Sequence, residues 1–182
     1  MVARSNADLL SLQKSLAAIP SAESSADNGD DLANELGFVA RAMMADVATK
    51  VWAVSLGGFD THANEKATHD RLMGELDASV ESFFSAIGDR HAVMVIYSEF
   101  GRRVAANASD GTDHGTAAPV LVIGPSVRGG FYGEQPSLVD LDAGDLKFTT
   151  DYRRVYSTVL GSVLGVNPKD ILGGAFEPVP FL

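Results

Sequence analysis

Three short stretches of the chain carry residue types from which catalytic and metal sites are built. The first, residues 55–62, ends in Asp60-Thr61-His62, which places a carboxylate and an imidazole two positions apart. In an extended backbone, residues two apart point to the same side, so these two side chains would share a face. Such a pair can bind a metal ion, orient a general base or cap a helix.

The other two stretches repeat this chemistry further along the chain. Residues 97–102 include Ser98, Glu99 and Arg102, and residues 111–115 hold Asp113 and His114 between glycines. Carboxylates and imidazoles together suit a hard or borderline divalent cation such as zinc, manganese or magnesium. The metal ligands that we predict are Asp60, His62, Glu99, Asp113 and His114.

Taken singly, each of these residues also fits a purely structural role. Asp60 can cap the helix that follows it, with His62 partly exposed in the first turn. Glu99 can form an ion pair with a nearby arginine, and the Asp113-His114 pair can form a turn. Their positions in three successive loops favour a shared site over these separate roles.

A catalytic triad is a rival interpretation, with Ser98 as nucleophile, His114 as base and Asp113 or Asp60 as the orienting carboxylate. A nucleophile elbow requires Gly-x-Ser-x-Gly, and residues 96–100 do not match it. The adjacent Asp113 and His114 cannot easily form the hydrogen bond that orients the base. The sequence therefore disfavours the triad. It also contains no glycine-rich phosphate loop.

The elements expected to position these residues alternate between helix and strand. Apolar residues at spacings of three and four predict helices, and near-continuous apolar runs predict strands covered on both faces. In chain order we expect a helix over 6–18, a helix over 31–49, a strand over 50–56, a helix over 63–87, strands over 91–98 and 118–124, a short hairpin before 146, and a helix from about 150 that stops at Gly165.

The order strand, long helix, strand is that of a βαβ unit with a right-handed crossover. We therefore predict an α/β fold with a mainly parallel sheet of three or more strands, flanked by helices. In such sheets, ligands bind beyond the carboxyl ends of the strands. The predicted ligands follow or precede the three expected strands, so this fold would bring them to one rim.

Length and composition indicate one domain behind a weakly packed N-terminal segment. The chain has 182 residues, of which 46% are hydrophobic and 21% charged, which is close to globular averages. Residues 20–30 are small, polar and aperiodic. We therefore expect a helix and a mobile linker over 1–30 and a single α/β domain over 31–182.

Charge and hydropathy exclude several classes of partner. The formal net charge of −10 and the pI near 4.7 argue against nucleic acid or an anionic membrane surface. The chain has no cysteine, which excludes a thiolate metal site. No apolar run approaches the ~20 residues that span a bilayer, and the first residues lack a signal-peptide pattern. We therefore expect no membrane insertion.

Four motifs in this order resemble a known bacterial family. They are Gly57–His62, Ser98–Arg102, Gly111–Gly115 and Val127–Gly130. From about residue 31 onward the chain resembles the domain-of-unknown-function 1501 family, which is placed in the alkaline phosphatase and sulfatase superfamily. Its members are typically longer and often carry a twin-arginine export signal. The resemblance therefore implies the C-terminal part of an exported, periplasmic protein with an alkaline phosphatase-like fold.

The resemblance also implies a function. It implies a metal-dependent hydrolase-like domain that acts on small anionic phosphate or sulfate esters. Asp60, His62 and His114 would bind one metal ion, Glu99 would bind a second, and Arg102 would steady an anionic group. Two such ions can clamp the attacking and leaving oxygens of an in-line displacement.

Three departures from the superfamily pattern bear on catalysis. Phe100 stands where the superfamily has a histidine, and the spacing of Asp60 and His62 is shorter than in well-studied phosphatases. The nucleophile segment of the superfamily lies near the N-terminus, and we expect this chain to lack it. The alternative is a non-catalytic α/β structural or ligand-binding module with a degenerate metal site. Core surface left exposed would favour self-association.

Overall fold

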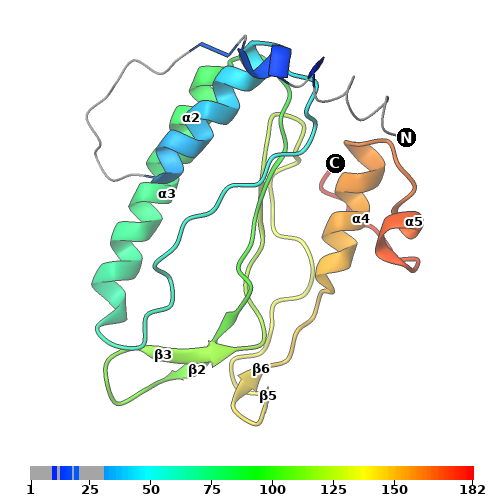
Figure 1. Ribbon diagram of the computed structural model, residues 1–182. Helices are drawn as coiled ribbons and strands as arrows, with labels where there is room; N and C mark the ends of the chain where they lie inside the picture. Colours follow the sequence, from blue (N-terminus) through cyan, green and yellow to red (C-terminus); the bar gives the residue numbers. More distant parts are fainter. Residues whose placement is uncertain (1–9, 12, 18, 21–30) are drawn as a thin grey trace. The chain divides into compact units, whose positions relative to one another are not determined.

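The computed structural model describes residues 10, 11, 13–17, 19, 20 and 31–182 (Figure 1). The described residues form two compact units. The first unit ends at Asp60 and resumes over Lys66–Arg90, and the second comprises Thr61–Glu65 and His91–Leu182. The expectation of a single domain over 31–182 stays a prediction.

Only part of the expected N-terminal segment is described. Residues 10, 11 and 13–17 are helical, as expected for this part of the helix over 6–18. The rest of that helix, and the linker expected over 20–30 apart from Pro20, lie outside the described residues.

Four helices and six short strands follow from residue 31 onward. The helices are α2 (Asp31–Met44), α3 (Glu65–Ile87), α4 (Tyr152–Ser162) and α5 (Pro168–Leu172). The strands are β1 (Met94–Ile96), β2 (Gly101–Ala106), β3 (Thr112–Gly115), β4 (Leu121–Ile123), β5 (Leu141–Asp142) and β6 (Asp145–Leu146).

The helices α2 and α3 form where the apolar stripes predict them. Each buries one face, and the buried apolar side chains are Leu32, Leu36, Val39, Ala40 and Ala42 on α2 and Leu72, Phe83 and Ile87 on α3. Gly88 follows α3 with a φ of 57°, the left-handed conformation in which glycine commonly ends a helix.

Helix α2 ends five residues earlier than its apolar stripe suggested. Asp46 adopts a φ of 56°, and the N–H groups of Ala45, Asp46 and Val47 bond back to carbonyls of the last turn. The Asp46 carboxylate accepts a hydrogen bond of 2.6 Å from Arg90. A non-glycine residue in the left-handed region is uncommon, so the sequence carries no signal for this end of the helix.

The predicted mainly parallel sheet is wrong. Residues 50–56, expected to form the first strand, have no strand structure. The strand expected over 91–98 shortens to β1, and the one over 118–124 to β4. These two strands pair antiparallel, with Met94 opposite Ile123, and every strand pair in the described chain is antiparallel.

Two physical reasons account for this difference. An apolar run alone does not specify a strand, and residues 50–56 have no strand structure, with Val51 and Val54 exposed. Trp52 contacts Phe38 of α2 edge-on at 6.3 Å between ring centroids, and Ser55 N–H bonds to Glu35. The βαβ unit expected from residues 50–56, α3 and residues 91–98 does not form, because 50–56 has no strand structure, and β1 pairs antiparallel with β4 instead.

The β2–β3 hairpin lies between the strands expected over 91–98 and 118–124, where the sequence predicted no strand. Gly101 pairs with Gly115 and Arg102 with His114, and the register shifts before Ala106 pairs with Thr112. The expected short hairpin before residue 146 is confirmed as β5–β6, whose turn residues Ala143 and Gly144 both have positive φ. Strand β6 lies against β2.

The C-terminal residues pack on α4 in the second unit. Val155 of α4, Val179 and Phe181 are buried together. Thr158 reinforces this contact, because its hydroxyl accepts from the N–H of Val179 at 2.8 Å. Arg128, from the fourth motif, donates to the carbonyls of Pro180 and Leu182. That motif therefore holds the C-terminal segment in place.

Helix α4 begins at Tyr152, close to the expected start, and packs with α5 (Figure 1). Helix α5 lies beyond the last element expected from the sequence. Its signals are nevertheless local: Asn167 caps it, Pro168 occupies its first turn and Gly173 ends it with a φ of 70°.

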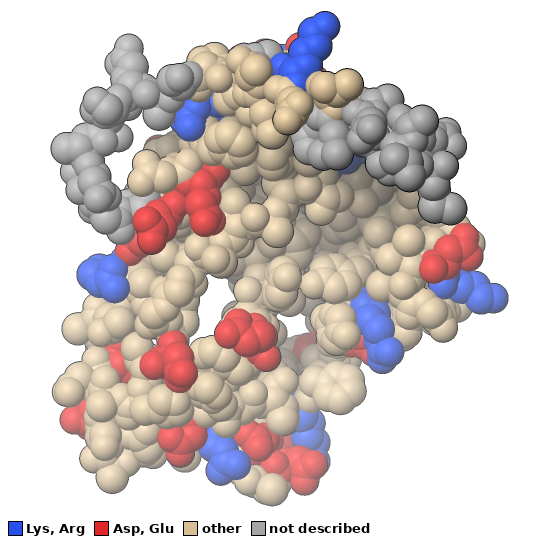
Figure 2. Space-filling view, in the orientation of Figure 1, with Lys and Arg blue, Asp and Glu red and all other residues tan. Residues whose placement is uncertain are grey.

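The surface is acidic in balance and partly apolar. On the face shown in Figure 2, acidic and basic side chains are scattered, without one broad basic patch. In the part of the chain that the structure describes, no helix combines the length and apolar character needed to cross a membrane. Several large apolar side chains are exposed in the stretch of chain between β4 and α4: Phe131, Leu138, Val139 and Phe148. Self-association stays a prediction.

Gly111, at the turn into β3, provides a test of this packing. A Cβ atom there would lie 2.4 Å from the carbonyl carbon of His62, so Gly111→Ala forces backbone apart. We expect the free energy of unfolding to fall by about 1–3 kcal/mol, measured by chemical denaturation. The control Gly129→Ala places its Cβ atom in open space and should change stability by less than ~0.5 kcal/mol. Equal effects would contradict this packing.

Candidate metal centre

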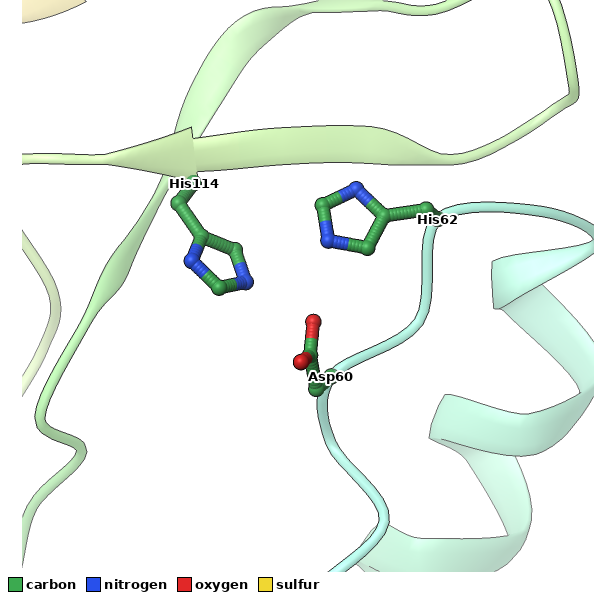
Figure 3. Close-up of side chains that lie close together, drawn as sticks. All are labelled: Asp60, His62 and His114. Carbon is green, nitrogen blue, oxygen red and sulfur yellow. The ribbon is translucent and has the colours of Figure 1, made fainter.

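Three of the predicted ligands come together. A carboxylate oxygen of Asp60 and one ring nitrogen each of His62 and His114 lie within 4.8 Å of one another, and all three residues are exposed. Figure 3 shows a ring nitrogen of each histidine facing the carboxylate of Asp60. Asp60 and His62 lie in one irregular segment, separated only by Thr61, and each contributes a ligand-type atom to this group.

The segment that carries His62 is bound to the tip of the β2–β3 hairpin. The N–H of Asn64 donates to the carbonyl of Ser109, and the N–H of Glu65 donates to that of Asp110, each at 3.0 Å. Gly111 lies against the backbone of His62. His114 is itself on β3 of the same hairpin. One hairpin therefore positions both histidines, although 52 positions separate them in the chain.

The side chain of Asn107 connects the hairpin tip to His62. Its Oδ1 accepts from the N–H groups of Ser109 at 2.8 Å and Gly111 at 3.2 Å. Its Nδ2 donates to the carbonyl of His62 at 3.0 Å and to Oδ1 of Asp113 at 3.3 Å. Asp113 also lies 3.3 Å from Nδ1 of His62. The backbone and the ring of His62 are thus both held from the hairpin.

These contacts stabilise the ionised carboxylate of Asp113. Its pKa is lowered, first by the side-chain hydrogen bond from Asn107 and then by the contact with His62. The side chain is 60% exposed, so solvent screens this effect and the carboxylate remains accessible.

His114 is held by stacking. Its ring lies 4.1 Å from that of Phe100 between centroids, at an angle of 14°, and 4.9 Å from the ring of His62. The guanidinium carbon of Arg102 lies 5.1 Å from the centroid of Phe100. Phe100 therefore supports a candidate ligand through its aromatic face.

Arg102 is engaged inside the second unit. Its Nε lies 3.6 Å from a carboxylate oxygen of Glu65, and its Nη atoms donate to the carbonyl of Thr112 and to the hydroxyl of Thr61. Thr112 in turn donates to Glu65 at 2.7 Å. These part-buried contacts bind the segment of Thr61 to the hairpin. A role for Arg102 toward an anionic group stays a prediction.

The remaining predicted residues lie differently. Asp113 is adjacent to His114 in sequence but contacts His62, so the structure places it beside the ligand group. Glu99 is exposed and is not a member of that group. The group of Asp60, His62 and His114 contains neither Glu99, the expected ligand of a second metal ion, nor Ser98, the nucleophile of the rival triad.

The donor set of this centre suits a borderline divalent ion. Two imidazole nitrogens and one carboxylate oxygen are the ligand types found around zinc, and three protein ligands leave a fourth position for water or substrate. Manganese accepts the same donors, whereas magnesium prefers an all-oxygen environment. The exposure of all three residues leaves such a position reachable from solvent.

Comparison with protein-family models identifies the family. A model described as "Protein of unknown function (DUF1501)" matches residues 3–171. The chain belongs to this family. Searches of curated proteins and of solved structures returned no match. Family membership, expected from the four motifs, is therefore confirmed, and the motifs now have structural positions in this DUF1501 chain.

Two residues of the centre were not singled out as contributors by the sequence. Phe100 was noted only as a departure from the superfamily, and Asn107 was placed in an irregular loop. A signal for Asn107 exists, since asparagine before a Ser-Asp-Gly run is typical of a tight turn stabilised by a side-chain oxygen. No sequence pattern indicates that Phe100 stacks on a histidine.

Replacing Phe100 tests the support of His114. Phe100→Leu keeps an apolar side chain but removes the aromatic face, so the His114 ring protons should lose ring-current shielding and shift downfield in proton NMR spectra. The four histidines of the chain make assignment direct. His69, which contacts Phe59 instead, serves as the internal control. Unchanged His114 signals would contradict the stacking.

Proposed function

We propose that this DUF1501 chain binds a divalent metal ion, zinc or manganese, through Asp60, His62 and His114. The observation that carries the proposal is the approach of their three ligand atoms to within 4.8 Å of one another. The donors come from two motifs that lie far apart in the sequence, and the hairpin contacts to residues 61–65 hold them together. This convergence is better explained by a shared ligand than by separate capping and turn roles.

We further propose that the centre belongs to a hydrolase-like domain acting on phosphate or sulfate esters. A divalent ion at such a centre supplies Lewis-acid polarisation of an ester oxygen and acidification of bound water. Asp60, His62 and His114 would bind the ion and leave one coordination position open to water or substrate. Glu99, exposed and next to Phe100 in the second motif, stays a proposed second-metal ligand. The proposal is supported by the resemblance of the four sequence motifs to those of the alkaline phosphatase and sulfatase superfamily.

One observation favours the alternative, a ligand-binding module without turnover. Arg102, the residue proposed to steady an anionic ester, is already bonded to Thr61, Thr112 and Glu65. With Arg102 held in these contacts, the centre has no arginine directed at an anionic ester, which favours ligand binding over turnover. Aryl phosphate and aryl sulfate assays on zinc- and manganese-loaded protein distinguish the two proposals, because only the hydrolase releases the phenol.

Metal binding itself is tested by titration calorimetry and by metal analysis after dialysis. Wild type is expected to retain zinc or manganese, and Asp60→Ala and His114→Ala should each weaken binding by more than the roughly 10- to 100-fold typical of outer residues. His91→Ala, which removes an exposed histidine outside the group, should bind like wild type. Wild type that binds neither ion would refute the proposal.

A further inference from the structure

A cavity in the first unit combines an apolar lining with one arginine. Its volume is about 390 Å³, and residues of α2 and α3 line it together with Pro20. The apolar residues of the lining include Gly37, Ala40, Met44 and Ala86, and its charged residue is Arg41. Small-molecule sites are typically of this size and mainly apolar, with a few fixed polar groups. The cavity shares no lining residue with the metal centre.

The guanidinium of Arg41 contains a buried donor that is not used. Its Nε atom is buried and has no hydrogen-bond partner among the described residues. An N–H group that loses water on folding without gaining an acceptor destabilises the fold, so native proteins rarely leave one unpaired. Arginine also keeps its positive charge in proteins. An anion bound in the cavity would supply both the acceptor and the opposite charge.

Helix α2 leaves room for this guanidinium at Gly37. A Cβ atom at Gly37 would lie 3.4 Å from Nη1 of Arg41, so the arginine side chain runs back over the preceding turn. Glycine in a helix interior is destabilising relative to alanine. The missing side chain at Gly37 lets the guanidinium lie against the helix, beside the apolar lining, instead of extending into water.

The acidic residues on either side of Arg41 in the sequence have other partners. Glu35 accepts a hydrogen bond of 3.1 Å from the N–H of Ser55. Asp46 accepts one of 2.6 Å from Arg90. Neither supplies an acceptor to Nε of Arg41. The net charge of −10 opposes anions at long range, but salt screens that field over ~10 Å, so the unpaired donor dominates at contact distance.

We infer that this cavity binds a small monocarboxylate with an apolar body, held through its carboxylate by Arg41. The guanidinium fork matches a carboxylate, which can accept two parallel hydrogen bonds from it. The rest of the lining is apolar, so a phosphate or sulfate would leave charged oxygens without donors. The apolar body of the ligand contacts Ala40, Met44 and Ala86 instead.

Octanoate and 1-octanol separate the two parts of this recognition, because they share an apolar body and differ in the charge. In calorimetric titrations of the full chain, octanoate should bind about 10- to 100-fold more tightly than octanol, as expected for hydrogen bonds between charged groups. Octanoate that does not bind, or that binds no more tightly than octanol, would overturn the inference.

Replacing Arg41 tests the same point from the side of the protein. Arg41→Met removes the charge and keeps a long apolar side chain, so octanoate binding should weaken about 10- to 100-fold while octanol binding stays unchanged. The matched control is Arg71→Met, which removes an exposed arginine of α3 that pairs with Glu75 and does not line the cavity. That variant should bind octanoate like wild type, and equal losses in the two variants would contradict a specific site.

Filling the cavity keeps the test decisive if Arg41→Met does not fold. Ala86→Leu places a larger apolar side chain in the lining and should weaken the binding of both ligands. Ala78→Leu makes the same change at an exposed position of α3 outside the lining and should weaken neither. Alanine and leucine have similar helix propensities, so both variants preserve the helix. Unaltered octanoate binding in Ala86→Leu would place the ligand elsewhere and refute the cavity.

Proton–nitrogen NMR reads the contact at the atom concerned. The Nε–H signal of Arg41, assigned by its loss in Arg41→Met, should shift when octanoate is added to metal-free protein and should stay in place when inorganic phosphate is added. A signal that does not move while octanoate binds would overturn the role of Arg41. Because no metal ion is present, this result is independent of the proposed metal site.

Discussion

The candidate centre depends on the hydrogen bonds that bind residues 62–65 to the tip of the β2–β3 hairpin. Asn107 donates one of them, to the His62 carbonyl, and the N–H groups of Asn64 and Glu65 supply two more. The same Asn107 amide also holds the hairpin tip, because it accepts from the N–H groups of Ser109 and Gly111. Ordering a residue in an irregular segment costs about 1–2 kcal/mol of backbone entropy, and several concurrent bonds offset that cost. Without them, His62 would have no fixed relation to His114.

A second set of contacts supports the other histidine. Phe100, His114 and His62 form a series of neighbouring rings, and Arg102 lies over the outer face of Phe100. Arg102 also donates a hydrogen bond to the hydroxyl of Thr61, which lies between Asp60 and His62. One guanidinium group therefore contacts both Phe100 and the segment that carries His62. Rigid support of this kind matters in an exposed centre, since solvent does not restrict the motion of the ligands.

Three of the five predicted ligands, Asp60, His62 and His114, lie together, although the topology from which we inferred their convergence is wrong. We expected Asp60, His62 and His114 to meet at the carboxyl ends of parallel strands, and the strand pairs of the described chain are antiparallel. The residues meet because His114 lies on a hairpin strand whose tip binds the segment of His62. The apolar runs over 50–56 and 91–98 did not specify strand length or direction, because the first has no strand structure and the second contains only the three residues of β1.

Local physics determined much of this protein from sequence alone: the helices α2, α3 and α4 from their apolar stripes, the β5–β6 hairpin from its turn, and the ligand types from the Asp-x-His and Asp-His motifs. Only the tertiary structure decided strand direction, the left-handed Asp46 that ends α2, and the contact of Asp113 with His62. Those features depend on partners distant in sequence. An imidazole, a carboxylate or an apolar run has several acceptable partners, and the folded chain selects among them by which hydrogen bonds and ring contacts it satisfies.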